Sequence, residues 1–549
     1  MKQRLKKSTI IFMVALLPFT FAIQSCNGVD PIEIIENILT VLDQTGWLQD
    51  KENMNDIPDD ITPFDDEDGG AMAGTVSLEN KFPPIGDQGQ YGTCVAWAVG
   101  YNLKTSLNAI EKGWTSTDLA NTANQTSPKD LWFAIPRDKV GENCGGTNFE
   151  PAMDALISTG VGSLSSVPYS GMGNCTGTAK GDGGNKLANY RKIASETEGL
   201  TPENFKGYLN AGRPIAIGAK LGDNFMTWKT NSVISSDTYN NPGMMHAYHA
   251  MALVGYDDSK NAFRVRNSWG TTWGDNGSIW VDYDFFCSGN FCFAAFVAQN
   301  QAVASATPPR LDGFDMLPLS AVDYAYTPNP DEPQNHNRAV EYGVYNSGTR
   351  NITPSQKWRV YYMYYNAKKA SDYKIIYEDY YTDEYGTEGD FDELDKSNAL
   401  VGGYWNNVTL NVGETINDEN YVTYEMPKIT GSYYLVVKVD VFDVIKEENE
   451  DNNFFFISAE NGKPLEFENG VIKNMPSKSE QLKGKELRPE LFANTENQTL
   501  VKPGNLNAYT PQEIQTMLLH DKKTGKLDAK LKAFRESNPE MKGVKKVKK

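Results

Sequence analysis

A cysteine at the expected start of a helix is the first residue here that could do chemistry. Cys94 follows Gly92 and Thr93, and the apolar run after it predicts a helix toward residue 110. Helix dipole and free backbone N–H groups stabilise a thiolate at a helix N-terminus. Because a lone cysteine before an apolar helix is more often a buried structural residue, its role depends on its neighbours. Gln88, six positions earlier, offers an amide donor for an oxyanion.

A histidine that could act as the base lies much later in the chain. The sequence contains four histidines, and two of them, His246 and His249, stand just before a small-residue strand pattern. We prefer His249 because the residues that follow it directly form the better strand. His246 is close enough to be a rival base.

An asparagine follows the next expected strand, in the string Asn-Ser-Trp-Gly-Thr-Thr-Trp-Gly-Asp-Asn-Gly at residues 267–277. Asn267 can accept a hydrogen bond from the imidazole of His249, which fixes the tautomer and turns the other ring nitrogen toward a thiol. Trp269 could cover that bond from water, although a Trp-Gly pair alone indicates only packing and turning.

These motifs together resemble the papain family of cysteine proteases. His249 lies 155 positions and Asn267 lies 173 positions after Cys94, slightly more than is usual in that family. The resemblance covers about residues 76–300 and implies an α+β, papain-like two-lobed fold with a helical lobe and a β-sheet lobe. It implies that Cys94 is the nucleophile of an acyl-enzyme mechanism, His249 its base and Asn267 the residue that orients the base. The Gln88 side chain and the Cys94 backbone N–H would form the oxyanion hole.

The resemblance also suggests residues that bind substrate. Gly145 and Gly146 resemble a Gly-Gly pair that holds the substrate backbone, and Tyr248 and Trp269 are expected at the cleft wall. The expected partner is a peptide or protein substrate. Because no metal-ligand cluster or phosphate-cradling glycine loop is evident, we expect neither a metal nor another cofactor.

Several positions depart from the family pattern. Tyr91 stands where the family usually has a cysteine, Val95 replaces a tryptophan, and Tyr248 replaces a small polar residue. The usual long inhibitory pro-segment is absent, and only a short helical patch at residues 32–48 could serve. These differences predict a divergent branch with its own specificity and control.

Composition and charge limit the remaining possibilities. A chain of 549 residues with 40% hydrophobic and 11% aromatic residues predicts two or three folded domains. A net charge of −19 argues against nucleic acid as a partner. Residues 521–549 are basic instead, with 11 Lys/Arg against 4 Asp/Glu. We expect a solvated tail there, with a surface or polymer contact as the alternative.

The N-terminus predicts export. A basic start precedes an apolar stretch at residues 10–23, which is short for a membrane-spanning helix. The following Ala-Ile-Gln-Ser-Cys, ending at Cys26, resembles a bacterial lipoprotein signal. That resemblance implies a lipid on Cys26 and a bacterial cell-envelope protein, membrane-anchored and facing the periplasm or the exterior. The alternative is a plain secretory signal cut near Ser25.

Six cysteines fit an exported protein. With Cys26 lipidated and Cys94 a free thiolate, four remain. Pairing Cys144 with Cys175 and Cys287 with Cys292 would give two disulfides, which an oxidising compartment permits, and other pairings stay open. After the resemblance, Cys144–Cys175 looks like a shifted version of a family disulfide.

Changes in composition and hydrophobic pattern along the chain divide it into five parts. We expect a signal at 1–25, an acidic linker or short pro-segment at 26–75, the protease-like domain at 76–305, a β-rich module at 306–460 and a polar extension at 461–549 with a helix near 510–536. The module resembles adhesion-like Ig-fold domains beside bacterial extracellular enzymes, which implies an all-β Ig-like sandwich. It could be a spacer or could contact a substrate, a protein or a glycan. Its acidic cluster at 447–453 is expected to be a solvated hairpin turn rather than a Ca²⁺ site.

The leading functional hypothesis is therefore an exported thiol peptidase. A binding lipoprotein with a catalytically silent papain fold is the second possibility. Another acyl-transfer enzyme, such as a cell-wall amidase or a transglutaminase, is the third. The presence of Cys94, His249, Asn267 and Gln88 together favours the peptidase.

Overall fold

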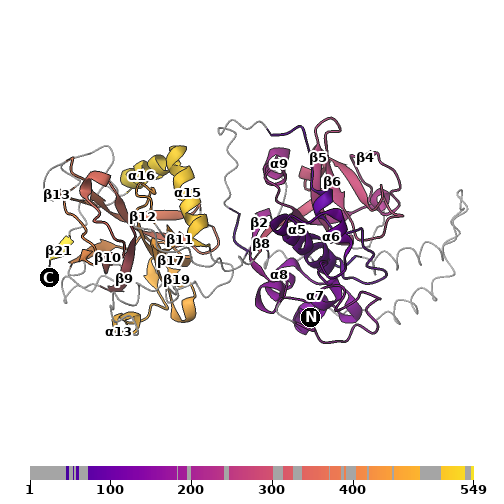
Figure 1. Ribbon diagram of the computed structural model, residues 1–549, viewed down its shortest axis with the longest axis horizontal. Helices are drawn as coiled ribbons and strands as arrows, with labels where there is room; N and C mark the ends of the chain where they lie inside the picture. Colours follow the sequence, from indigo (N-terminus) through magenta and orange to yellow (C-terminus); the bar gives the residue numbers. More distant parts are fainter. Residues whose placement is uncertain are drawn as a thin grey trace, which may run out of the picture.

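The computed structural model describes most of the chain in separate stretches. They are residues 45–48, 54, 57–60, 72–181, 184–194, 200–239, 247–300, 313–325, 337–369, 371–384, 389–390, 403–416, 420–447, 450–482, 509–537 and 546–548. Figure 1 shows two bodies side by side: an N-terminal α+β domain and a strand-rich C-terminal module. Cys26, His246 and the stretch expected to be a signal lie outside the described residues.

One twisted sheet organises the N-terminal domain. Its strands follow the order β2-β8-β3-β5-β6-β7-β4, and β1 also pairs with β5. The bounds are β1 Thr75–Ser77, β2 Leu187–Ala194, β3 Ile215–Leu221, β4 Val233–Ile234, β5 Ala247–Asp257, β6 Ala262–Arg266, β7 Ser278–Asp282 and β8 Cys292–Asn300. Strand β2 is therefore at the edge of the sheet, while β5 and β6 lie inside it.

A long buried helix runs along this sheet, as the apolar run after Cys94 predicts. It comprises α4 (Cys94–Ala96), a π-helical stretch η3 (Trp97–Lys104) and α5 (Thr105–Lys112). Shorter helices surround it or cover the sheet: α6 Ser116–Ala120, α7 Pro128–Ala134, α8 Phe149–Ser158, α9 Pro202–Asn210, α10 Asp223–Met226 and α11 Tyr283–Cys287.

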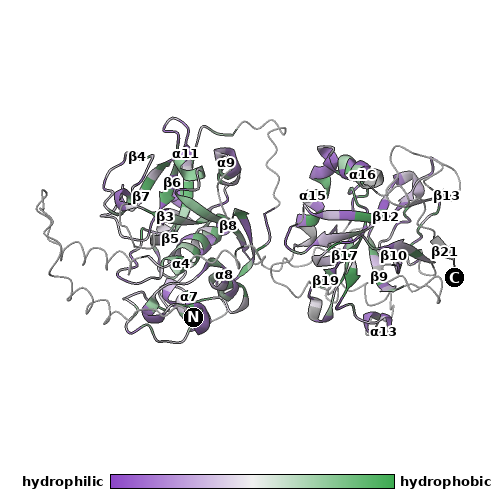
Figure 2. Ribbon diagram, turned by 180° about the vertical axis from the view of Figure 1, so that it is seen from behind, coloured by the Kyte–Doolittle hydropathy of each residue, from purple (hydrophilic) through white to green (hydrophobic). Residues whose placement is uncertain are grey.

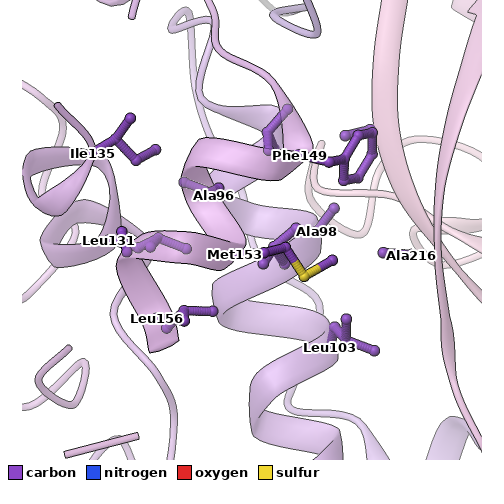
Figure 3. Packing of buried hydrophobic residues seen from close by; sticks show 14 of the residues in the cluster. Ala96, Ala98, Leu103, Leu131, Ile135, Phe149, Met153, Leu156 and Ala216 are labelled. Atoms are coloured by element: carbon purple, nitrogen blue, oxygen red, sulfur yellow. The ribbon is translucent and has the colours of Figure 1, made fainter. Parts of the chain in front are cut away.

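The core of this domain holds the long helix in place. Small residues such as Ala96 and Ala98 let it approach Met153 and Leu156 of α8, and Ala216 of β3 belongs to the same cluster (Figure 3). Each of these side chains is almost fully removed from water, which is the main source of stability in such a layer. The N-terminus of the long helix is thus fixed against the sheet.

Two sheets build the C-terminal module. The first contains β9 Met316–Ala325, β10 Asn337–Asn346, β15 Thr415–Ile416, β16 Asn420–Glu425 and β21 Lys546–Lys548. The second contains β11 Arg359–Asn366, β12 Tyr373–Tyr381, β13 Gly389–Asp390, β14 Gly403–Asn406, β17 Gly431–Val439, β18 Phe454–Ile457, β19 Leu465–Glu468 and β20 Val471–Ile472. Aromatic and β-branched residues from both sheets form one core. The region is strand-rich, as its sequence predicts.

A helical hairpin from the end of the chain packs on the second sheet of this module. The sequence predicts one helix near 510–536, whereas the structure has α15 (Pro511–Lys523) and α16 (Lys526–Ser537), with a turn at Gly525. Tyr509 and Leu518 pack with Met363 in one cluster. The extension therefore covers a sheet face here and is not only a solvated tail. A further short helix, α13 (Lys478–Leu482), is mainly hydrophilic (Figure 2).

The acidic cluster of the module is not the freely solvated turn that its charges suggest. Asn452 and Asn453 are buried, and Asn453 donates to Glu447 at 3.0 Å. The buried ammonium of Lys438 lies 3.8 Å from Asp443, and the charges of Glu447 and Glu450 in the cluster also act on it. No group of three or more potential metal ligands was found among the described residues. Within the same described residues, no helix has the length and apolar character needed to span a bilayer.

Candidate active site

Cys94 occupies the first position of the long helix and is fully buried. Its sulfur accepts a hydrogen bond from the backbone N–H of Ala250 at 3.4 Å, so the helix N-terminus meets strand β5 directly. The backbone N–H groups of Cys94 and Val95 also act on the sulfur and favour its ionised form. The predicted nucleophile is therefore beside the strand that carries the predicted base.

His249 and Asn267 form the polar pair that the sequence predicts. The two residues lie on neighbouring strand ends, and Nε2 of His249 is 2.7 Å from Oδ1 of Asn267. The indole of Trp269 covers this pair, with its ring centroid 4.8 Å from the imidazole. His249 is fully buried, and its Nδ1 has no hydrogen-bond partner among the described residues. This ring nitrogen is thus available for a proton from a nucleophile. His246, the rival base, lies outside the described residues.

Gln88 is fixed by two hydrogen bonds in the loop before the long helix. Its Oε1 accepts from the Ser268 hydroxyl at 2.7 Å, and its Nε2 donates to the Tyr91 carbonyl at 2.8 Å. The Tyr169 hydroxyl donates to the Gln88 carbonyl and lies 2.9 Å from the hydroxyl of Thr93. These contacts hold the loop that ends at the nucleophile. They give the amide of Gln88 a single orientation, as an oxyanion donor requires.

A short stretch from the expected linker lies over this constellation. We call residues 45–48 the cleft segment. Gly46 accepts from the backbone N–H of Thr147 at 2.8 Å, and Leu48 donates to the Thr147 carbonyl at 2.9 Å. The backbone N–H of Gly46 also points at the Cys94 sulfur. A Cβ added to Gly46 would lie 2.0 Å from the Gly92 carbonyl oxygen, so only glycine fits there.

Trp47 anchors the cleft segment in an aromatic pocket. Its indole packs edge-on against Phe149 and Tyr248, with centroid distances of 5.7 and 5.6 Å. Its backbone N–H donates to the Tyr248 carbonyl at 3.2 Å. Gly218 leaves room for the ring, since a Cβ there would lie 2.5 Å from it. Tyr248, expected at the cleft wall, therefore contacts the protein's own chain.

Burial governs the ionisation of Cys94 and His249. Removal of water raises the pKa of the Cys94 thiol to about 12, against the smaller lowering effect of its backbone hydrogen bonds. Burial lowers the pKa of His249 to about 4, although the bond with Asn267 acts in the opposite direction. In this covered state the pair is a neutral thiol and a neutral imidazole at pH 7.

The predicted glycine pair lies against the cleft segment. Gly146 has a φ of +116°, and a Cβ on it would meet the Gly46 carbonyl oxygen at 2.6 Å. Gly145 lies in the preceding turn, where its N–H donates to the Glu142 carbonyl at 2.9 Å. The residue that pairs with the segment's backbone is Thr147, next to Gly146.

The cysteine pairing predicted from sequence needs one correction. Cys144 and Cys175 form a disulfide next to the glycine pair. Cys287 and Cys292 are buried thiols that form no disulfide, so the second predicted disulfide is wrong. Cys287 ends α11 and Cys292 begins β8, where its thiol is 3.5 Å from the Ala294 carbonyl oxygen. Their close spacing in the sequence does not fix the directions of their side chains.

Sequence reasoning names residues 32–48 as the only stretch able to serve as a pro-segment, but it singles out none of the positions within 45–48. It also gives no role to Thr147. The available signal was a Gly-Trp pair, Gly46-Trp47, in an otherwise acidic stretch. A large aromatic residue in a linker indicates a packing partner elsewhere in the fold.

Comparison with known proteins shows similarity to cysteine proteases. Residues 76–292 match the family model described as Papain family cysteine protease. Cysteine proteinase 2 of Entamoeba histolytica is 30% identical over 40% of this chain and 64% of its own length. Cysteine proteinase 1 of the same organism is 27% identical over the same shares. The chain thus spans less than two thirds of these relatives. The crystal structure of xylellain, a cysteine protease from Xylella fastidiosa, matches with 20% identity and a TM-score of 0.38, covering 47% of this chain and 97% of that one.

Proposed function

We propose that this chain is a thiol peptidase that uses its papain-family cysteine protease domain, residues 76–292, to hydrolyse peptide bonds. The Cys94 sulfur would attack the scissile carbonyl carbon after passing its proton to Nδ1 of His249. His249 would return that proton to the leaving amine, and water would then hydrolyse the acyl-enzyme. The Gln88 amide and the Cys94 backbone N–H would stabilise the oxyanion. Asn267 would keep the imidazole in position.

One observation carries this proposal. A buried imidazole whose Nε2 is bonded to Asn267 keeps its Nδ1 without a partner among the described residues. The adjacent residue, Ala250, contacts the sulfur of a cysteine at a helix N-terminus. Unpartnered buried polar atoms are rare and need a reason. Proton transfer with Cys94 is such a reason.

We further propose that the cleft segment keeps the enzyme inactive until it is displaced. The group that it presents to the Cys94 sulfur is the Gly46 N–H, a hydrogen-bond donor and not a carbonyl carbon. The segment therefore blocks the site without being a substrate in this position. Displacement would let water return, and the pKa values of Cys94 and His249 would move toward their ordinary range. The expected short pro-segment at 26–75 then acts through residues 45–48.

Hydrolysis of a mixed peptide library by the full chain tests the proposal. Gly46→Ala should activate the enzyme, because its Cβ cannot fit beside the Gly92 carbonyl. Gly74→Ala is the matched control, since nothing lies within 4 Å of a Cβ at that position. Cys94→Ala in the Gly46→Ala background should abolish cleavage.

The outcomes separate the two parts of the proposal. Cleavage that persists in the Cys94→Ala double variant contradicts the assigned nucleophile. Equal activity of wild type, Gly46→Ala and Gly74→Ala contradicts the blocking role of the cleft segment but leaves the peptidase intact. A complete lack of cleavage by Gly46→Ala under reducing conditions contradicts the peptidase itself.

The cellular place of this activity is proposed from the sequence alone. The basic and apolar N-terminus and Cys26 support export and a lipid anchor in a bacterial envelope, facing the periplasm or the exterior. The strand-rich module is proposed to have an Ig-like topology. Metabolic labelling with a fatty-acid analogue, compared between wild type and Cys26→Ser, tests the anchor: labelling of both proteins alike contradicts it.

A further inference from the structure

The role of the C-terminal module is open from sequence, and contacts near the cleft segment bear on it. We propose that this module is an internal clamp: it fastens residues 57–60 to the protease domain and so keeps the cleft segment in the active site. The inference rests on the proposed blocking role of residues 45–48. It gives the module a function beyond that of a spacer.

Residues 57–60, which we call the edge segment, extend the protease sheet. The backbone N–H of Lys192 in edge strand β2 donates to the Pro58 carbonyl at 2.8 Å, and Asp60 donates to the Lys192 carbonyl at 2.7 Å. The Asp60 carboxylate pairs with Arg213 at 2.9 Å, and its side chain is only 3% exposed. One side of the edge segment is therefore satisfied by the protease domain.

The other side of the edge segment faces the module. In an extended chain, alternate residues direct their backbone groups to opposite sides. Asp59 follows this rule: its N–H donates to the Lys368 carbonyl at 3.2 Å, and its carbonyl accepts from the Tyr509 hydroxyl at 3.1 Å. Tyr509 shares that hydroxyl with the Lys368 carbonyl at 3.0 Å. The module thus closes the second edge of this segment.

A buried ion pair fixes the module to the same strand. The guanidinium of Arg191 in β2 donates to both carboxylate oxygens of Glu513 at 2.9 and 2.7 Å. The Arg191 side chain is 2% exposed, and its guanidinium lies 5.2 Å from the Tyr509 ring centroid. In Figure 1, α15 lies on the side of the module that faces β2. A two-pronged pair of this kind fixes orientation as well as proximity.

Tyr509 and Glu513 move with the module. Tyr509 belongs to the cluster in which α15 and α16 pack on the second sheet, and Glu513 closes the capping box of α15 with Thr510. Only eight residues separate the edge segment from Leu48. A tether this short keeps the cleft segment at a high effective concentration near Cys94, as long as residues 57–60 stay in place.

Hydrogen exchange of the full chain, followed by mass spectrometry on the peptide that covers residues 45–48, tests the clamp. Tyr509→Phe keeps the ring but removes the shared hydroxyl, and we expect about five-fold faster exchange at residues 45–48. Glu513→Gln keeps the helix cap but removes the charge opposite Arg191, and we expect an increase of more than about ten-fold. The matched control is Tyr373→Phe, whose hydroxyl donates to Asp521 inside the module at 2.9 Å; its exchange at residues 45–48 should match wild type.

Exchange does not depend on catalysis, so this test stands apart from the test of the peptidase. Unchanged exchange at residues 45–48 in both Tyr509→Phe and Glu513→Gln would overturn the clamp, even if Gly46→Ala cleaves peptides. Equal acceleration by Tyr373→Phe would also overturn it, because general loosening of the module would then explain the effect. Faster exchange in the two interface variants alone supports it.

Discussion

Two buried polar clusters in this chain differ in how their atoms are satisfied. In the C-terminal module, the carboxylate of Asp323 receives hydrogen bonds from three side chains, including Tyr362 at 2.6 Å, and the atom of that cluster without a partner in the described part of the chain is Nη2 of Arg338, at its periphery. In the candidate active site, Nδ1 of His249, Nδ2 of Asn267 and Nε1 of Trp269 have no partner among the described residues. Both clusters are fully removed from water at their centres.

Under the proposed function, the difference separates a polar cluster that stabilises a fold from one that takes part in a reaction. A carboxylate whose two oxygens both accept hydrogen bonds stabilises one arrangement of the strands around it. A cluster with open hydrogen-bonding positions is less stable than it could be, and such sites are typical of function. Variants at the two clusters should therefore affect different measurements.

The largest expected effect is on catalysis. In the Gly46→Ala background, Cys94→Ala should lower peptide hydrolysis by about a million-fold, because the nucleophile is lost. The melting temperature should change little, since the two side chains are similar in size. Initial rates with a fluorogenic peptide and a thermal melt measure both. A variant that unfolds would place Cys94 with the structural cluster and contradict the comparison.

The corresponding change in the module should affect stability instead. Asp323→Asn leaves the buried guanidinium of Arg338 without a compensating charge, and we expect a loss of about 3–5 kcal/mol in unfolding free energy. Urea denaturation followed by fluorescence measures this loss. In the Gly46→Ala background, peptide hydrolysis should stay within about two-fold of the parent because the site is some distance from the module core. A large loss of hydrolysis with unchanged stability would contradict the assignment of the Asp323 cluster to stability.

Asn267→Ala should have an intermediate effect on catalysis. Without the bond to Nε2, the imidazole of His249 can rotate away from Cys94, and we expect kcat/KM to fall on the order of 100-fold. Asn267→Gln should restore part of the activity if the role is positioning. Steady-state kinetics of both variants in the Gly46→Ala background provide the measurement. Equal activity of Asn267→Ala and its parent would show that the imidazole is held in another way.

The effect of pH on the equilibrium between the covered and open states should be smaller than the effects of these substitutions, but it has a distinctive profile. His249 binds a proton near pH 4 when covered and near 6.5 when exposed, so acid stabilises the open state as the pH falls between these values. Cys94 loses its proton near 12 when covered and near 9.0 when exposed, so alkali stabilises the open state above about pH 9. The cleft segment should therefore bind most tightly between about pH 6.5 and 9.

Alkylation of Cys94 in Gly46→Ala and in wild type tests this window. The ratio of the two rates removes the intrinsic pH dependence of the thiol. It should be largest near pH 7–8 and should fall by about ten-fold by about pH 5.5, in the range where the exposed imidazole gains a proton. A ratio that does not change with pH would show that closure of the cleft by residues 45–48 does not shift the pKa values of Cys94 and His249, and would contradict this prediction.

The smallest expected effect concerns the cysteines outside both clusters. Unfolding without reductant should expose Cys287 and Cys292 to alkylation, whereas Cys144 and Cys175 should react only after reduction. Peptide mapping measures all four. Protection of Cys287 and Cys292 in the absence of reductant would reinstate the disulfide that the sequence predicts.

Local patterns predict much of the candidate site. Cys94 stands at the start of a helix, His249 near the start of a strand and Asn267 directly after a strand, and apolar runs with ordinary periodicity mark those elements. Gln88 is predicted because it offers an amide donor six positions before Cys94, as the resemblance to the papain family implies. The strands of the module are likewise predictable from local runs of aromatic and β-branched residues.

Contacts between distant parts of the chain could not be predicted in this way. The bond between Tyr509 and Asp59 joins residues 450 positions apart, and the pair of Arg191 with Glu513 joins residues 322 positions apart. Neither changes a local hydrophobic pattern. Residues 45–48 belong to the stretch named as the candidate pro-segment, but their contacts could not be predicted, because partners such as Thr147 and Tyr248 meet them only in the folded domain.

The identity of the residue modified by a peptidyl epoxide inhibitor tests the central claim most directly. The full chain with Gly46→Ala should gain one inhibitor mass, and peptide mapping should place it on Cys94. Wild type should react more slowly, and the Cys94→Ala double variant should not react. Modification of another residue, or of none in the Gly46→Ala protein, would contradict the account of Cys94 as a nucleophile covered by the protein's own chain.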